Sequence, residues 1–175
     1  MNMLHEFYIA TGVAAAFGLY VLSKTKEVYE KGEALSTSLS VGWWITDTAW
    51  TTLVSLSSLY NIWPLWIERT IALAGGLALL GAGIILIVVG AFEFRSLRKI
   101  SGMEISKLIT TGIYRWSRNP QFLGFYLALL GISLLGCSGY ALLLTTIAIV
   151  YCHHYIVKTE EPYLERIFRK EYMIY

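Results

Sequence analysis

The chain has 175 residues, of which 56% are hydrophobic and 15% are charged. Soluble domains carry about 25% charged residues, so this composition exceeds the apolar content that one water-soluble core could use. It favours an all-α, polytopic membrane protein that folds as a single bundle over residues 1–175. A net charge of +2 without a long basic run argues against a nucleic-acid partner. Two cysteines outside any Cys-x-x-Cys pair predict neither a metal site nor a disulfide framework.

Five apolar runs are long enough, or nearly so, to cross about 30 Å of hydrocarbon. They are residues 3–23, 39–60, 65–92, 120–136 and 139–157. The first run has no basic residue ahead of it and exceeds a signal-peptide core in length, so we interpret it as a retained membrane helix. The third is long enough to tilt or to project into water.

The basic residues divide the chain in the same way. Three follow the first run, six follow the third and four follow the last, whereas Arg69 alone lies near the start of the third run. Basic residues gather on the cytoplasmic side of membrane proteins. The sequence therefore predicts five transmembrane helices, with the amino terminus outside and the carboxyl terminus in the cytoplasm.

Two features predict how these helices pack. Only residues 137–139 join the fourth and fifth runs, which predicts a tight antiparallel hairpin. In the third run, glycines recur every seven residues and alanines every four, as Gly76, Gly83, Gly90 and Ala74, Ala78, Ala82. Such stripes let helices approach closely in lipid. We expect packing inside the bundle; a dimer contact is the alternative, and the oligomeric state stays open.

Residues 162–175 have the pattern of a carboxyl-terminal amphipathic helix on the membrane surface or folded back over the bundle. One face carries Leu164, Ile167, Phe168, Tyr172 and Tyr175. Pro162 disfavours a helical conformation at the residue before it, so we expect the fifth helix to break at Glu161.

The first candidate site lies at the start of the fourth run. Asn119 suits a helix N-cap and Pro120 suits the first helical position. The free backbone N–H groups and the helix dipole, with Arg118 beside them, predict an anion-binding site at the cytoplasmic interface. The alternative is a basic anchor that only fixes topology.

The second candidate site lies at the end of the fifth run. A spacing of seven residues puts His153 and Glu160 on one helical face, with Glu161 nearby. The short hairpin returns this segment to the side of Arg118, so these four residues can meet. Ionisable residues at membrane depth are costly and are functional candidates. The alternative is that both carboxylates are solvated and pair with neighbouring basic residues.

The second run is unusually polar for a membrane helix. Trp43, Asp47, Trp50 and Val54 fall on one face. They could line a groove for a lipid tail. We prefer the interpretation that the tryptophans pack in the bundle and that Asp47 is paired internally.

Together the two candidate sites resemble a known family. The pattern Gly-x-Tyr-x-x-x-Arg-[His/Asn]-Pro-x-[Tyr/Phe]-x-Gly runs from Gly112 to Gly124, and His153 and Glu160-Glu161-Pro162 follow it. In this respect residues 105–175 resemble the isoprenylcysteine carboxyl methyltransferases and their phospholipid methyltransferase relatives, while residues 1–104, the amino-terminal spans, carry no signature. The length suggests a small prokaryotic or archaeal member. Many members have His where Asn119 stands, so no acid–base role rests on that position.

The resemblance implies methyl transfer from S-adenosylmethionine, bound on the cytoplasmic side, to a lipophilic acceptor that enters from the bilayer. The acceptor most in keeping with it is the carboxylate of an isoprenylcysteine. One alternative is an amine or phospholipid methyltransferase of the same fold, and another is a non-enzymatic transporter subunit or scaffold.

The same resemblance suggests roles for individual residues. The cofactor carboxylate would meet His153 or the helix start, which comprises Asn119, Pro120 and Gln121. Its ribose would meet Glu160 or Glu161, and its adenine or sulfonium would face Tyr114, Phe122 and Tyr155. Arg118 would hold an acceptor carboxylate in a bidentate fork, and Glu161 would act in catalysis, as the base if the acceptor is an amine.

Overall fold

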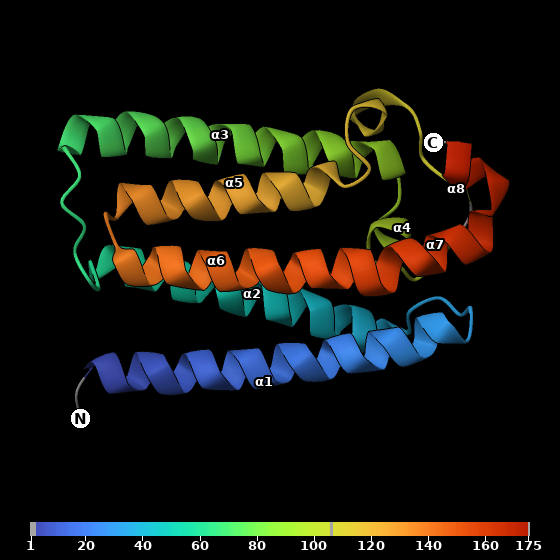
Figure 1. The fold of residues 1–175 in the computed structure, drawn as a ribbon, viewed down its shortest axis with the longest axis horizontal. Helices are drawn as coiled ribbons and strands as arrows, with labels where there is room; N and C mark the ends of the chain where they lie inside the picture. The colour runs from blue at the N-terminus through green and yellow to red at the C-terminus, as the bar shows by residue number, and fades with distance from the viewer. Residues whose placement is uncertain (1–2, 106, 175) are drawn as a thin grey trace.

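The computed structural model describes residues 3–105 and 107–174, and this part of the chain is helical, with an isolated bridge between Pro64 and Ser138. The prediction of an all-α chain is confirmed. The long helices lie side by side along the long axis of the molecule (Figure 1). They are α1 (Met3–Glu30), α2 (Thr37–Leu59), α3 (Arg69–Phe94), α5 (Pro120–Leu135) and α6 (Gly139–Tyr155).

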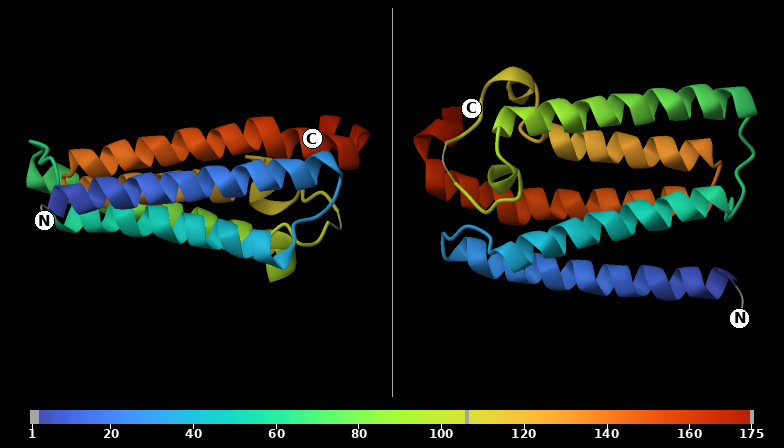
Figure 2. Two further views of the ribbon diagram at one scale, coloured as in Figure 1. Left: turned by 90° about the horizontal axis from the view of Figure 1, so that it is seen from below. Right: turned by 180° about the vertical axis from the view of Figure 1, so that it is seen from behind.

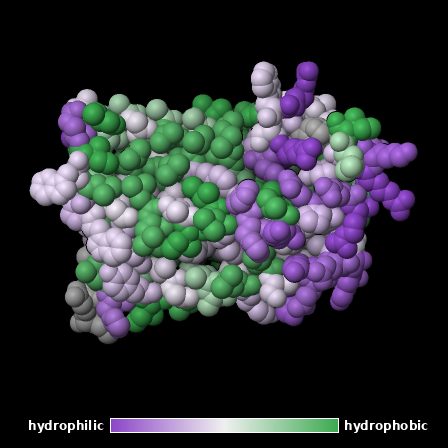
Figure 3. Space-filling model, in the orientation of Figure 1, coloured by the Kyte–Doolittle hydropathy of each residue, from purple (hydrophilic) through white to green (hydrophobic). Residues whose placement is uncertain are grey.

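Three helical segments of the described chain are long and apolar enough to cross a membrane. They are Leu4–Glu30, Arg69–Phe94 and Gly139–Phe168, and Pro120–Leu135 is a shorter apolar helix. Figure 3 shows apolar side chains over the middle of the bundle and hydrophilic ones gathered at the end that holds α7 and α8. This polarity fits a bundle with one end in water. Five complete spans, and their orientation, stay predictions.

The glycines of α3 face α5, which confirms packing inside the bundle. A Cβ on Gly83 would lie 2.5 Å from the carbonyl oxygen of Gly124, and one on Gly131 would lie 2.6 Å from the backbone nitrogen of Leu80. Real side-chain atoms do not approach so closely, so these positions accept only glycine. The alanine stripe of α3 is exposed instead.

The predicted hairpin between α5 and α6 is also confirmed. Ser138 caps α6 by accepting a hydrogen bond from the backbone of Ala141, at 3.2 Å. Its hydroxyl donates to the carbonyl of Ile62, at 2.6 Å, so the hairpin also holds the α2–α3 connection. Figure 2 shows both connections at the end of the bundle opposite α7 and α8.

Helix α1 is longer than its apolar run. It continues to Glu30 through ion pairs one turn apart, Lys24–Glu27 at 2.9 Å and Lys26–Glu30 at 3.9 Å. Trp43 of α2 donates its indole N–H to Thr25 of α1, at 2.8 Å. This hydrogen bond joins α1 to α2 near the end of the bundle where the candidate residues lie.

The expected helix break at Glu161 is wrong. The helix runs from α6 through a π turn, Ile156–Glu160, directly into α7, Glu161–Phe168. A π turn relieves the clash that Pro162 would cause in a regular α-helix. The helix therefore becomes wider at the position where we expected it to end. The break lies at Arg169, whose φ is 46°, and the short α8 (Lys170–Ile174) follows. Residues 162–174 are therefore two short helices, and Tyr175 lies outside the described residues.

Candidate functional site

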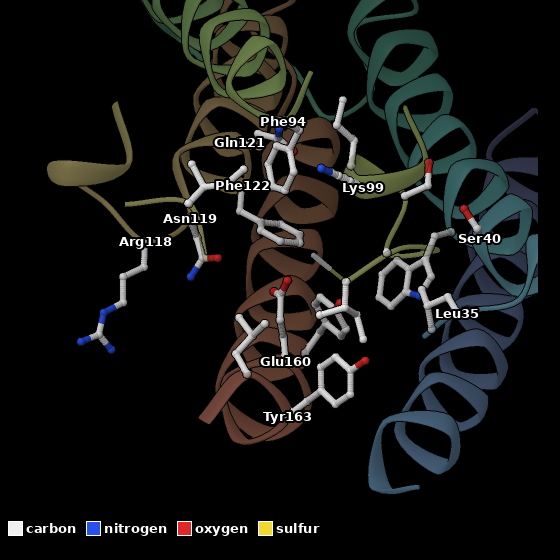
Figure 4. A pocket seen from close by; sticks show the side chains of 18 of the residues that line it. Leu35, Ser40, Phe94, Lys99, Arg118, Asn119, Gln121, Phe122, Glu160 and Tyr163 are labelled. Carbon is white, nitrogen blue, oxygen red and sulfur yellow. The ribbon is translucent and has the colours of Figure 1, made fainter. Parts of the chain in front are cut away.

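A cavity of about 600 Å³ lies at the end of the bundle where α5 begins and α7 follows α6. Its walls come from α2, the end of α3, residues 99–102, 104–105 and 107–109, the start of α5, and the π turn with α7 and α8. The short helix α4 (Leu97–Ile100) and the 3-10 turn Gly112–Arg115 lie in the connection that covers it. Figure 4 shows side chains from these elements converging on the cavity.

Most of the residues singled out from the sequence line this cavity. They are Tyr114, Arg118, Asn119, Gln121, Phe122, Tyr155, Glu160 and Glu161. Pro120 is buried in the first turn of α5 and does not line the cavity. His153 is exposed and also lies outside the lining. The π turn between His153 and Glu160 is wider than an α-helical turn, so a spacing of seven residues no longer puts them on one face.

Two polar groups of the cavity lining are buried without a partner. The Oε2 atom of Glu160 and the Nε2 atom of Gln121 make no hydrogen bond with any residue in 3–105 or 107–174. Figure 4 shows the Glu160 carboxylate pointing towards Asn119 and Phe122. Buried polar groups are nearly always hydrogen-bonded in folded proteins. An acceptor and a donor left open in one cavity indicate a polar ligand.

Aromatic rings narrow the cavity next to Glu160. The Tyr155 ring lies 4.5 Å from that of Trp43 and 5.9 Å from that of Phe122, measured between centroids. We call these three residues the aromatic collar. Tyr29 and Tyr163 stack at 3.9 Å beside it. Faces of aromatic rings attract cations and stack on flat heterocycles, so the collar suits a ligand that carries either group.

The helix start at Asn119 and Pro120 occurs where the sequence predicts it, with one difference. The side chain of Asn119 makes no capping hydrogen bond, whereas its backbone N–H donates to the Ser117 hydroxyl, at 3.2 Å. Asn119 and Gln121 line the cavity, so the first turn of α5, whose backbone N–H groups have no partner within the helix, lies at the cavity. Anion binding there stays a prediction.

Arg118 is exposed and contacts the carboxyl-terminal helix. Its guanidinium carbon lies 5.0 Å from the centroid of the Tyr172 ring, and Figure 4 shows the side chain directed away from Glu160. Burial raises the pKa of Tyr172 above its ordinary value, which keeps the ring neutral beside the cation. Tyr114 is buried, with its ring 5.6 Å from that of Phe94 in an edge-on contact.

The wall that α2 contributes was expected from the sequence only as the less favoured alternative. Trp43 and Asp47 line the cavity, whereas Trp50 and Val54 are buried in the core. The packing interpretation therefore holds for Trp50 and Val54, and the internal pairing expected of Asp47 is wrong. The signal was present in the three- to four-residue spacing of polar and aromatic residues along α2.

Comparison with known proteins gives a consistent family. The family model for phospholipid methyltransferases matches residues 70–171, which is more than half of the chain. A 68-residue segment is 34% identical to the protein-S-isoprenylcysteine O-methyltransferase of Saccharomyces cerevisiae; it covers 39% of this chain and 28% of the yeast protein. No solved structure matches significantly. The chain belongs to the phospholipid methyltransferase family.

Proposed function

We propose that this protein transfers a methyl group from S-adenosylmethionine to a lipid-borne acceptor that enters its cavity from the bilayer. Membership of a methyltransferase family supports methyl transfer. The observation that supports a bound cofactor is the buried, unpartnered Oε2 atom of Glu160 beside the aromatic collar. A carboxylate accepts hydrogen bonds from ribose hydroxyls, and aromatic faces suit both an adenine and a sulfonium.

Different residues around Glu160 would bind different parts of the cofactor. When bound, the cofactor supplies an electrophilic methyl group on a positively charged sulfur. The collar would hold that charge against ring faces and exclude water from it. The open N–H groups at the start of α5 and the Gln121 amide would hold the carboxylate of the amino-acid tail. Glu161, half-buried in the same wall, would lie next to the reacting groups.

The acceptor is proposed only as a class. An isoprenylcysteine carboxylate, in keeping with the yeast relative, would use Arg118 as a bidentate clamp, and that side chain would first have to leave Tyr172. A phospholipid amine would need a base. The site would lie at a membrane surface, since hydrophilic side chains gather at its end of the bundle. That surface would be the cytoplasmic one, because the basic residues follow the first, third and fifth spans, with the amino terminus outside.

The test is binding of S-adenosylhomocysteine to the purified protein in detergent, measured by calorimetry. We expect the wild type to bind, and Glu160→Gln to weaken binding at least tenfold because the ribose hydroxyls lose a charged acceptor. His153→Ala, outside the cavity lining, is the matched control and should bind as the wild type does. Folded wild-type protein without affinity would refute the proposal and favour a non-enzymatic membrane protein.

A further inference from the structure

One face of α2 forms a polar stripe along the cavity. Residues three to four apart share a face of an α-helix, and this face carries Ser40, Trp43, Trp44, Asp47, Thr48, Thr51 and Thr52, all of which line the cavity. From Ser40 to Thr52 the stripe extends about 18 Å at the rise of an α-helix. The wall opposite the deeper part is apolar and includes Ile87 and Phe125.

Asp47 is the charged residue of this stripe, and no residue in 3–105 or 107–174 forms a hydrogen bond or ion pair with its carboxylate. The three ion pairs found there lie elsewhere. Thr51 donates to the backbone carbonyl of Asp47, at 2.8 Å, and leaves the carboxylate open. A carboxylate held away from bulk water is costly unless something compensates its charge.

The aromatic collar separates Asp47 from Glu160. Asp47 lies near Tyr151 and Cys152 of α6, and Trp43 of the collar lies between Tyr151 and Tyr155, with ring centroids 5.9 and 4.5 Å away. Glu160 follows Cys152 by eight residues, which is roughly 12 Å along the helix at the rise of an α-helix. The cavity thus has a carboxylate on each side of the collar, and the proposed function assigns only the one at Glu160.

We propose that Asp47 determines the charge of the acceptor: it binds a protonated lipid amine and disfavours a carboxylate. This inference rests on the proposed function, which puts the methyl donor at the collar and therefore the acceptor on the side of Asp47. An ammonium group compensates the charge of the half-buried Asp47 carboxylate, whereas a carboxylate would meet a like charge beside an apolar wall, where repulsion is stronger than in water. The hydroxyls of Thr48 and Thr52 can accept its remaining N–H groups.

The proposed methyl transfer to the amine conserves atoms and charge. The amine nitrogen becomes a nucleophile when one of its protons passes to the Asp47 carboxylate. The nitrogen lone pair then forms the bond to the methyl carbon while the carbon–sulfur bond breaks, and the electron pair of that bond stays on sulfur. Asp47 later returns the proton to water.

The experiment compares two probes of equal chain length and opposite charge, oleylamine and oleate. Tritiated probes are bound at neutral pH to the wild type and to Asp47→Asn in lipid nanodiscs, with empty nanodiscs subtracted. Glu104→Gln removes the same charge from the exposed rim of the cavity, where Glu104 already pairs with Lys99 at 3.9 Å, and serves as the control. Binding of S-adenosylhomocysteine reports folding and tests the proposed function separately.

We expect the wild type and Glu104→Gln to prefer the amine at least tenfold, and Asp47→Asn to lose this preference while it binds S-adenosylhomocysteine normally. A preference for oleate, no preference in the wild type, or a preference that survives in Asp47→Asn would overturn the inference and leave the cofactor site standing. Failure of the wild type to bind S-adenosylhomocysteine would instead remove the function on which the inference rests.

Discussion

Arg118 and Tyr172 connect the start of α5 to the last described helix through a cation–π contact of 5.0 Å. Tyr172 is 2% exposed, so its ring fills space as well as facing the cation. We expect Tyr172→Phe to keep most of the stability and Tyr172→Leu to lose about 1 kcal/mol more, since only the first retains the ring. Thermal unfolding in detergent measures the difference; equal melting temperatures for the two variants would show that the contact contributes nothing.

Substitution of Arg118 by Lys separates the two acceptor chemistries. Because the side chain is directed towards Tyr172 and away from Glu160, we expect Arg118→Lys to change kcat/KM for a lipid amine by less than about threefold. A bidentate clamp on a carboxylate would not survive the change, since Lys lacks the planar fork. A loss of tenfold or more, with unaltered unfolding, would favour the carboxylate acceptor and count against Asp47.

The aromatic collar predicts that the methyl donor and its demethylated product bind with different sensitivity to loss of a ring. S-adenosylmethionine carries a positive sulfur and S-adenosylhomocysteine does not, so removal of an aromatic face should affect the former more. We expect Trp43→Leu to weaken binding of the charged form at least threefold more than binding of the neutral form. Trp43→Phe, which keeps a ring, is the control, and calorimetry with both ligands measures the ratio. An equal loss for both ligands would place the sulfur away from the collar.

The contact between α3 and α5 predicts opposite effects at two nearby glycines. A Cβ at Gly83 would lie 2.5 Å from a backbone oxygen of α5, whereas a Cβ at Gly81 would meet no atom within 4 Å. Alanine is the better helix former by about 1 kcal/mol, so Gly81→Ala should leave stability unchanged or raise it. Gly83→Ala should lower it by roughly 1–3 kcal/mol because the helices must separate. Melting temperatures of the pair decide, and the idea fails if Gly83→Ala is neutral.

The part of the candidate site that depends on the tight turn between α5 and α6 could be predicted from the sequence. Because only three residues join α5 and α6, Arg118 and Glu160 had to return to the same end of the bundle, and both line one cavity. His153 was placed incorrectly relative to Glu160 for a local reason. Its predicted face assumed an ideal α-helix, and the accommodation of Pro162 by a π turn cannot be read from periodicity.

The wall formed by α2 shows a second limit. A repeat of three to four residues identifies a helical face, but it does not say whether that face meets lipid, another helix or a cavity. Asp47 and Trp50 are three residues apart, yet Asp47 lines the cavity and Trp50 is 3% exposed in the core. Only the arrangement of α2 against α5 and α6 distinguishes the two, and that arrangement depends on contacts between residues far apart in the sequence.

The glycine contact between α3 and α5 also decides how the molecule can open. With no side chain between them at Gly83 and Gly124, the backbones of these two helices pack directly against each other, so we expect them to stay together. On the other side of the cavity, the hydrogen bond from Trp43 to Thr25 joins α2 to α1. The cavity therefore lies between two pairs of joined helices, and we expect a lipid to enter it by displacing α1 and α2 rather than by separating α3 from α5.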